Sequence, residues 1–234
     1  MKYLPLFLFT TLLAVSANAQ SGKNTYQVKT GNDANKVIPY EGRYQFPDFR
    51  DGEVFFRNGN SSRAKMNYNR VHGEVMFISP ARDTMLFANA DYINHILIAN
   101  DIFYYQKGHG HVRLERDLGD VKLGRKEFLA KMDHEKNAAY GQYSSTSAIS
   151  SYSTFVNSTG EYQFLNVNER VMLARRAVFF FIDKNNILYV ANRNNLLKVF
   201  PSKKSAVNKY LRENQVNFES AGDLEKAIVF CNEL

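Results

Sequence analysis

Short apolar runs separated by turn residues at close intervals occupy residues 52–126. The run GEVFFRNG ends in Asn58-Gly59, a dipeptide typical of two-residue hairpins because it accepts the positive φ of a type I′ turn. The runs RAKMNY, EVMFIS, DTMLFA, INHILIA, DIFYYQ, HVRLER and VKLGRK follow at similar spacing. Eight runs joined by short polar turns predict an antiparallel meander with one buried face.

The last third of the chain changes from strand-like to helix-like patterns. The segments RVMLARRAVFFFID and ILYVAN predict two strands joined by a turn at residues 184–186. Asn194 or Asn195 is placed to cap a short helix, and Ser220 with Asp223 has the form of a capping box before a final helix. We therefore predict an α+β chain, with an antiparallel β-meander followed by a β-hairpin and a small C-terminal helical part.

The first twenty residues have the three parts of a secretory signal peptide. Lys2 precedes an apolar run over residues 4–15, and Ala17 and Ala19 form an A-x-A cleavage site. Residues 1–19 are thus the expected signal peptide, with cleavage between Ala19 and Gln20. We expect an exported protein that is periplasmic or extracellular, and no later stretch is apolar for the roughly 20 residues of a transmembrane segment.

Changes in composition divide the mature chain. Residues 20–45 are a polar N-terminal arm, and residues 46–138 form the expected β-meander domain, whose last part, EFLAKMDHEKNA, fits a short helix or a frayed strand. Residues 139–160 are rich in Ser and Thr and predict a surface loop or linker. Residues 161–234 contain the hairpin and the helices.

Charge and composition narrow the classes of partner. The formal net charge is +7 without a polybasic tract, which argues against nucleic acid and leaves only a weak contact with acidic membrane surfaces. The chain has 14 Tyr and 18 Phe but no Trp, which argues against a carbohydrate-binding site without excluding one, because tyrosine can also stack on sugars. The only cysteine, Cys231, rules out an internal disulfide and fits an apolar helix face.

The segment YYQKGHGHVRLERD holds two histidines that suggest a metal site. His109 and His111 are two residues apart, so on a strand they point to the same face and can hold one ion. A third ligand would come from one of His72, His95, Asp101, Glu115 or Asp117. The alternative is a solvated hairpin turn, which Gly108 and Gly110 favour. No G-x-S-x-G, H-E-x-x-H or phosphate-binding glycine motif is present, so we expect neither catalytic residues nor a cofactor.

Several segments together resemble a class of exported, uncharacterised proteins of Bacteroidota-type bacteria. They are SANAQ, GEVFFRNG with KMNYN and GEVMFI, AYGQYSSTSAISSY, NNLLKVFPSKKSAVNKYLRENQVNF and DLEKAIVFCNEL. The resemblance implies a Gram-negative envelope as the location and carries no assigned activity. Our leading hypothesis is a non-enzymatic binding module that contacts a protein or glycan of the envelope through its sheet. A small exported hydrolase and a metal-binding protein using His109 and His111 are the alternatives.

Overall fold

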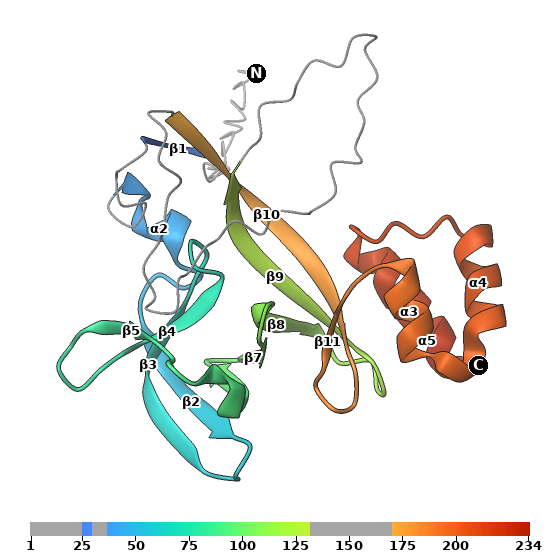
Figure 1. The fold of residues 1–234 in the computed structure, drawn as a ribbon, viewed down its shortest axis with the longest axis horizontal. Helices are drawn as coiled ribbons and strands as arrows, with labels where there is room; N and C mark the ends of the chain where they lie inside the picture. Colours follow the sequence, from blue (N-terminus) through green and yellow to red (C-terminus); the bar gives the residue numbers. More distant parts are fainter. Residues whose placement is uncertain (1–24, 30–36, 132–169) are drawn as a thin grey trace, which may run out of the picture.

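The computed structural model describes residues 25–29, 37–131 and 170–234, and Figure 1 shows their arrangement. The strands are β1 (Thr25–Lys29), β2 (Arg50–Phe56), β3 (Ser61–Asn69), β4 (Glu74–Ile78), β5 (Thr84–Leu86), β6 (Ile93–Ile98), β7 (Asp101–Gln106), β8 (Gly110–Arg116), β9 (Lys122–Lys131), β10 (Arg170–Ile182) and β11 (Leu188–Val190). The α-helices are α2 (Tyr40–Arg43), α3 (Arg193–Val199), α4 (Lys204–Glu213) and α5 (Ala221–Glu233), with 3-10 turns η1 (Ala90–Tyr92) and η2 (Pro201–Lys203).

All the described strands belong to one antiparallel sheet. Its order is β1-β10-β9-β8-β7-β6-β2-β3-β4-β5, and β11 also pairs with β10. Most neighbours in the sheet are also neighbours in the sequence, which confirms the predicted meander and the α+β class. The predicted meander and the predicted hairpin share this sheet because β9 pairs with β10 from Lys122↔Ile182 to Lys131↔Leu173.

Two details of the meander differ from the simplest expectation. In the β2–β3 hairpin only Gly59 has positive φ, at 87°, while the N–H of Gly59 bonds to the carbonyl of Phe56. The turn is therefore a type I turn followed by a glycine bulge, not a type I′ turn. The segment that fitted a helix or a strand continues β9 as far as Lys131, and its remaining residues lie outside the described part.

The sheet curls, so that strands distant in its order meet. The hydroxyl of Tyr68 on β3 donates to the carbonyl of Glu127 on β9 at 2.7 Å, and the amide of Leu129 donates to the carbonyl of Arg70 at 2.9 Å. At the other end, the amide of Leu188 on β11 donates to Gln106 on β7 at 2.8 Å. These contacts bring β3 onto β9 and β11 towards β7.

The curled sheet encloses separate apolar clusters. One lies within β2–β7 and consists of Val54, Met66, Tyr68, Val75, Ala90, Ile93, Ile96, Ile98 and Phe103. A second lies on β7–β11 and consists of Tyr104, Val112, Phe128, Val178, Phe180, Ile182 and Leu188. A third lies between the helices and the sheet, where β9 begins and β10 ends. It includes Leu123, Phe179, Phe181, Leu196, Val207, Leu224 and Ile228.

The C-terminal helices begin where local side chains cap them. The Ser220 hydroxyl accepts the amide of Asp223 at 3.3 Å, which confirms the predicted cap of α5. The cap of α3 is Asn192, which accepts the amide of Asn195 at 2.9 Å, so the predicted cap at 194 or 195 was two to three residues late. Cys231 is buried on the inner face of α5, and burial raises its thiol pKa to about 11.

The polar arm contributes more structure than its composition indicates. Residues 25–29 form β1, which pairs with β10, and α2 follows at residues 40–43. Val28 is 1% exposed and packs with Ile38, Val71 and Leu129. The predicted signal peptide and the Ser/Thr-rich linker lie outside the described residues. None of the described helices is long and apolar enough to cross a membrane.

Candidate functional site

The structure places the two histidines of the GHGH segment in different surroundings. His109 lies in the β7–β8 turn, where its ring meets Phe180 edge-on with centroids 5.2 Å apart. His111 lies on β8, is 1% exposed, and packs against Tyr105 with centroids 5.0 Å apart. Burial, and then the nearby Lys126 ammonium, lower the pKa of His109. The solvated-turn interpretation is therefore wrong for His111.

His111 makes its principal polar contact with β4. Its Nδ1 contacts the Glu74 carboxylate, and the amide of Val75 lies 3.3 Å from the same nitrogen. We assign the proton to Nδ1, because a hydrogen bond to an ionised carboxylate is the stronger of the two. The buried Nε2 then has no hydrogen-bond partner among the described residues. Those residues contain no group of three potential metal ligands, so the metal role of His109 and His111 stays a prediction.

Lys126 lies beside the Glu74–His111 pair. Its ammonium donates to the carbonyl of His109 at 2.6 Å, and burial lowers its pKa although the Glu74 charge opposes the shift. A Cβ at Gly110 would lie 2.5 Å from the Glu74 carboxylate and 2.8 Å from the Lys126 nitrogen. A Cβ at Gly73 would lie 2.9 Å from the same nitrogen. This packed interior position fits a structural link between β4, β8 and β9.

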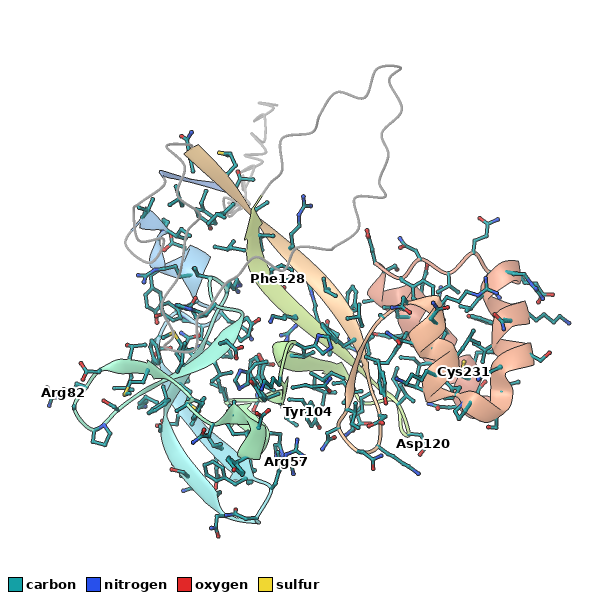
Figure 2. All side chains as sticks on the ribbon, viewed as in Figure 1. Arg57, Arg82, Tyr104, Asp120, Phe128 and Cys231 are labelled. Atoms are coloured by element: carbon teal, nitrogen blue, oxygen red, sulfur yellow. The ribbon has the colours of Figure 1, made fainter. Side chains whose placement is uncertain are left out.

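A second group of residues lies on β2, β6 and β7 and is more accessible. The ring of Phe55 stacks on His95 with centroids 4.5 Å apart and planes 13° apart, and His95 lies 6.2 Å from the ring of Tyr104. Phe55 and His95 are half-buried, while Tyr104 is 7% exposed. In Figure 2, Tyr104 is labelled just above Arg57 of the β2–β3 hairpin, and Cys231 of the helices is labelled to the right of both.

Polar groups from distant segments border these rings. The ammonium of Lys122 lies 5.1 Å from the Tyr104 ring centroid and donates to its hydroxyl at 3.3 Å and to Asn186 at 3.2 Å. The side-chain amide of Asn186 donates in turn to Asn94 at 3.1 Å. Asn186 has a φ of 60°, so it occupies a left-handed turn position that asparagine tolerates. We call Phe55, His95, Tyr104, Lys122, Asn94 and Asn186 the aromatic–amide patch.

Exposed apolar side chains come next to the patch in the sequence. Tyr92, two residues before Asn94, is 68% exposed, and Ile187, which follows Asn186, is 42% exposed. Burial, and then the Lys122 charge, lower the pKa of His95, so its ring is neutral near pH 7. The patch therefore combines neutral rings, amides and one cation, a set suited to contact with a polar ligand that has apolar faces.

Sequence reasoning found parts of this patch but not the whole. The Phe55-Phe56 and Tyr104-Tyr105 pairs indicated one ring on each face of a strand, and His95 was considered only as a metal ligand. No sequence signal joins Asn94 to Asn186, which are 92 residues apart. Comparison of the chain with models of protein families, with curated proteins and with solved structures gave no match.

Proposed function

We propose that the chain is an exported, non-enzymatic binding module that contacts a protein or glycan of the cell envelope through the aromatic–amide patch. The observation that carries this proposal is the stack of Phe55 and His95 beside the linked amides of Asn94 and Asn186. Aromatic faces bury the apolar side of a ligand, and adjacent amides bond its polar groups without the cost of desolvating a charge. The predicted signal peptide supports export.

The chemistry of the patch favours binding over catalysis. His95 contacts aromatic rings, and burial, followed by the Lys122 charge, lowers its pKa, which disfavours the protonated form that a general acid needs. The Glu74–His111 pair is a carboxylate with a histidine, but the imidazole is 1% exposed and therefore poorly accessible to a substrate. Both observations support a surface that holds a partner rather than transforms it.

The test removes patch side chains without disturbing the sheet. Asn186→Gly deletes the amide and keeps the positive φ, because glycine adopts it freely. Lys122→Gln removes the cation near Tyr104. Lys198→Gln is the matched control, because Lys198 lies 5.0 Å from the ring of Tyr189 outside the patch. Cosedimentation of the purified mature chain with peptidoglycan sacculi, envelope polysaccharide and outer-membrane protein fractions measures binding.

We expect the parent chain and the control to bind one of these fractions equally, while both patch variants lose about tenfold in affinity. A tenfold loss corresponds to about 1.4 kcal/mol, the worth of one or two hydrogen bonds. Equal binding by all four proteins would contradict the assignment of the patch, and binding to none of the fractions would contradict the proposed class of partner.

A further inference from the structure

A charged stretch lies between two apolar clusters on one face of β9 and β10. Where β9 begins and β10 ends, Leu123 and Phe181 pack beneath the C-terminal helices. Towards the other end of the two strands, Leu129 and Leu173 pack with Val28 of β1. In Figure 1 the C-terminal helices stand beside one half of the β9–β10 pair, and β1 lies at its other end. The part of this face between the two clusters carries the charges.

Three arginines from neighbouring strands meet on this part of the sheet. Side chains two residues apart in a strand share a face, so Arg125 and Glu127 of β9 lie on the face of the two clusters. Arg175 of β10 lies on the same face, next to Ala177, which pairs with Glu127 and is exposed. Arg113 of β8 pairs directly with Arg125. The side chains of the three arginines are between 29% and 40% exposed, so solvent reaches all of them.

Arg125 is the least paired of these arginines. Among the described residues its ion-pair partner is Glu127, whose Oε1 lies 3.0 Å from Nη2. Its guanidinium lies 5.9 Å from the ring centroid of Phe179, a contact with an aromatic ring that arginine favours. Within the part of the chain that the structure describes, its buried Nε has no hydrogen-bond partner. An unpaired buried donor is costly, so Arg125 has capacity for a further acceptor.

The charges in this cluster do not cancel. Ion pairs join four guanidinium groups to three carboxylates, and the members are Arg70, Arg113, Arg125, Arg175, Asp101, Glu115 and Glu127. Like charges that face each other across two strands are unfavourable, and Arg113 faces Arg125 in this way. One excess positive charge matches a singly charged anion. A carboxylate fits this charge and binds a guanidinium through two parallel hydrogen bonds, whereas a doubly charged phosphate would be repelled by the three carboxylates already present.

We propose that Arg113, Arg125 and Arg175 form a binding site for the carboxylate group of a ligand. Arg125 is the principal contact, because the other two arginines donate more of their N–H groups to carboxylates of the chain. Phe179 supports the guanidinium of Arg125 from one side. The small side chain of Ala177 leaves the adjoining surface uncovered, so a ligand can approach between β9 and β10.

This site goes beyond the proposed function, because it lies on the other face of the sheet from the aromatic–amide patch. Phe103 of β7 pairs with Arg113, and the next residue, Tyr104 of the patch, points to the opposite face. We therefore expect Asn186→Gly to leave carboxylate binding unchanged. Failure of the patch to bind an envelope fraction would equally leave the carboxylate site standing.

Arg125→Lys tests the site without removing its charge. Lysine keeps the positive charge but lacks the planar fork that binds a carboxylate through two hydrogen bonds. The matched control is Arg176→Lys, because Arg176 is exposed on the opposite face of β10, where it pairs with Phe128. The ion pair of Arg125 is partly exposed, so we expect both variants to fold, and their urea midpoints check this.

Four small probes identify the anion and its source. Acetate represents a free small acid. N-acetyl-alanyl-alanine with a free carboxyl end represents a peptide, and the same peptide with an amide end is its control. Inorganic phosphate tests the choice of anion, and sodium chloride at equal ionic strength corrects each titration for screening.

NMR titration of the purified mature chain measures binding through the backbone amides of residues 125–127 and 175–177. We expect saturable shifts with the two carboxylate probes, an affinity about tenfold lower in Arg125→Lys, and no change in Arg176→Lys. Tighter binding of the peptide acid than of acetate assigns a peptide as the source, and equal affinities assign a free acid. Equal affinity of Arg125→Lys and the parent chain, equal binding of the peptide amide and acid, or tighter binding of phosphate than of acetate overturns the proposal, as does the absence of saturable shifts.

Discussion

Replacing Glu127 with glutamine tests how the curl of the sheet is held. The carboxylate of Glu127 on β9 meets three guanidinium groups. Arg70, in the turn after β3, approaches at 3.3 Å, Arg125 on β9 at 3.0 Å, and Arg175 on β10 donates from Nε at 3.0 Å. Glu127 therefore links the turn after β3 to β9 and β10, and Glu127→Gln removes the negative charge while keeping the shape.

The contact with Arg70 dominates the expected effect. The Arg70 side chain is 7% exposed, whereas those of Arg125 and Arg175 are 34% and 40% exposed. Breaking a buried ion pair costs about 3 to 5 kcal/mol, but exposed pairs are worth about 0 to 1 kcal/mol. Glutamine retains one acceptor, and Arg70 keeps its contact with the carbonyl of Tyr44. We expect Glu127→Gln to lower the free energy of unfolding by about 2 to 4 kcal/mol.

Urea denaturation followed by circular dichroism measures this change. The control is Glu53→Gln, because Glu53 also accepts hydrogen bonds from an arginine, Arg63, and from Ser61, but on an exposed hairpin. We expect a much smaller shift of the urea midpoint for the control, since water screens this pair. Equal midpoints for the two variants would refute the argument that burial of Arg70 makes Glu127 important.

We expect low pH to weaken the ion pairs of Glu127. Burial alone would raise the pKa of Glu127, but the hydrogen bond from Arg175 and the charges of Arg175, Arg125 and Arg70 outweigh it, so the pKa is lowered. A carboxyl group with a lowered pKa in the folded state stabilises it fully above the unfolded value of about 4.3. This stability is lost as the pH falls below that value through the folded pKa. We therefore expect Glu127→Gln to reduce the acid slope of stability, measured by urea titrations at stepwise lower pH.

Two further substitutions probe the core and the metal hypothesis. A Cβ at Gly124 would lie 2.7 Å from Val112, so we expect Gly124→Ala to cost about 1 to 3 kcal/mol in the same denaturation assay, and an unchanged midpoint would show that the core adjusts freely. His109 and His111 contact different rings, so we expect the double change to alanine to leave the bound zinc measured after dialysis unchanged. Loss of one zinc per chain would instead establish the predicted site.

The local pattern of the sequence was sufficient to predict most of the strands and most of the helical part. Alternating apolar residues marked β2 to β9, and the capping pair at Ser220 marked the start of α5. β1 was missed because its exposed residues are polar and Val28 is its one buried apolar residue among those with described side chains. Its partner, β10, lies more than 140 residues further along the chain, and only that pairing makes the segment a strand.

The polar contacts between distant strands could not be predicted from the sequence for the same reason. Glu74 and His111 are 37 residues apart, and the role of each depends on how far the sheet curls. A pattern of period two states which residues share a face, but not which faces meet. The interpretation of His111 as a turn residue failed because curling covers this strand with β4.

The geometry of the aromatic–amide patch depends on the far end of the sheet. Lys122 and Asn186 come from β9 and from the β10–β11 turn, whereas the rings come from β2, β6 and β7. The bond from Leu188 to Gln106 fixes β11 near β7, and it thereby holds Asn186 within reach of Asn94. Asn186 belongs to the turn that leads into β11, so binding at the patch should stabilise β11. Slower exchange of the Leu188 amide in the presence of ligand is the signature of this link.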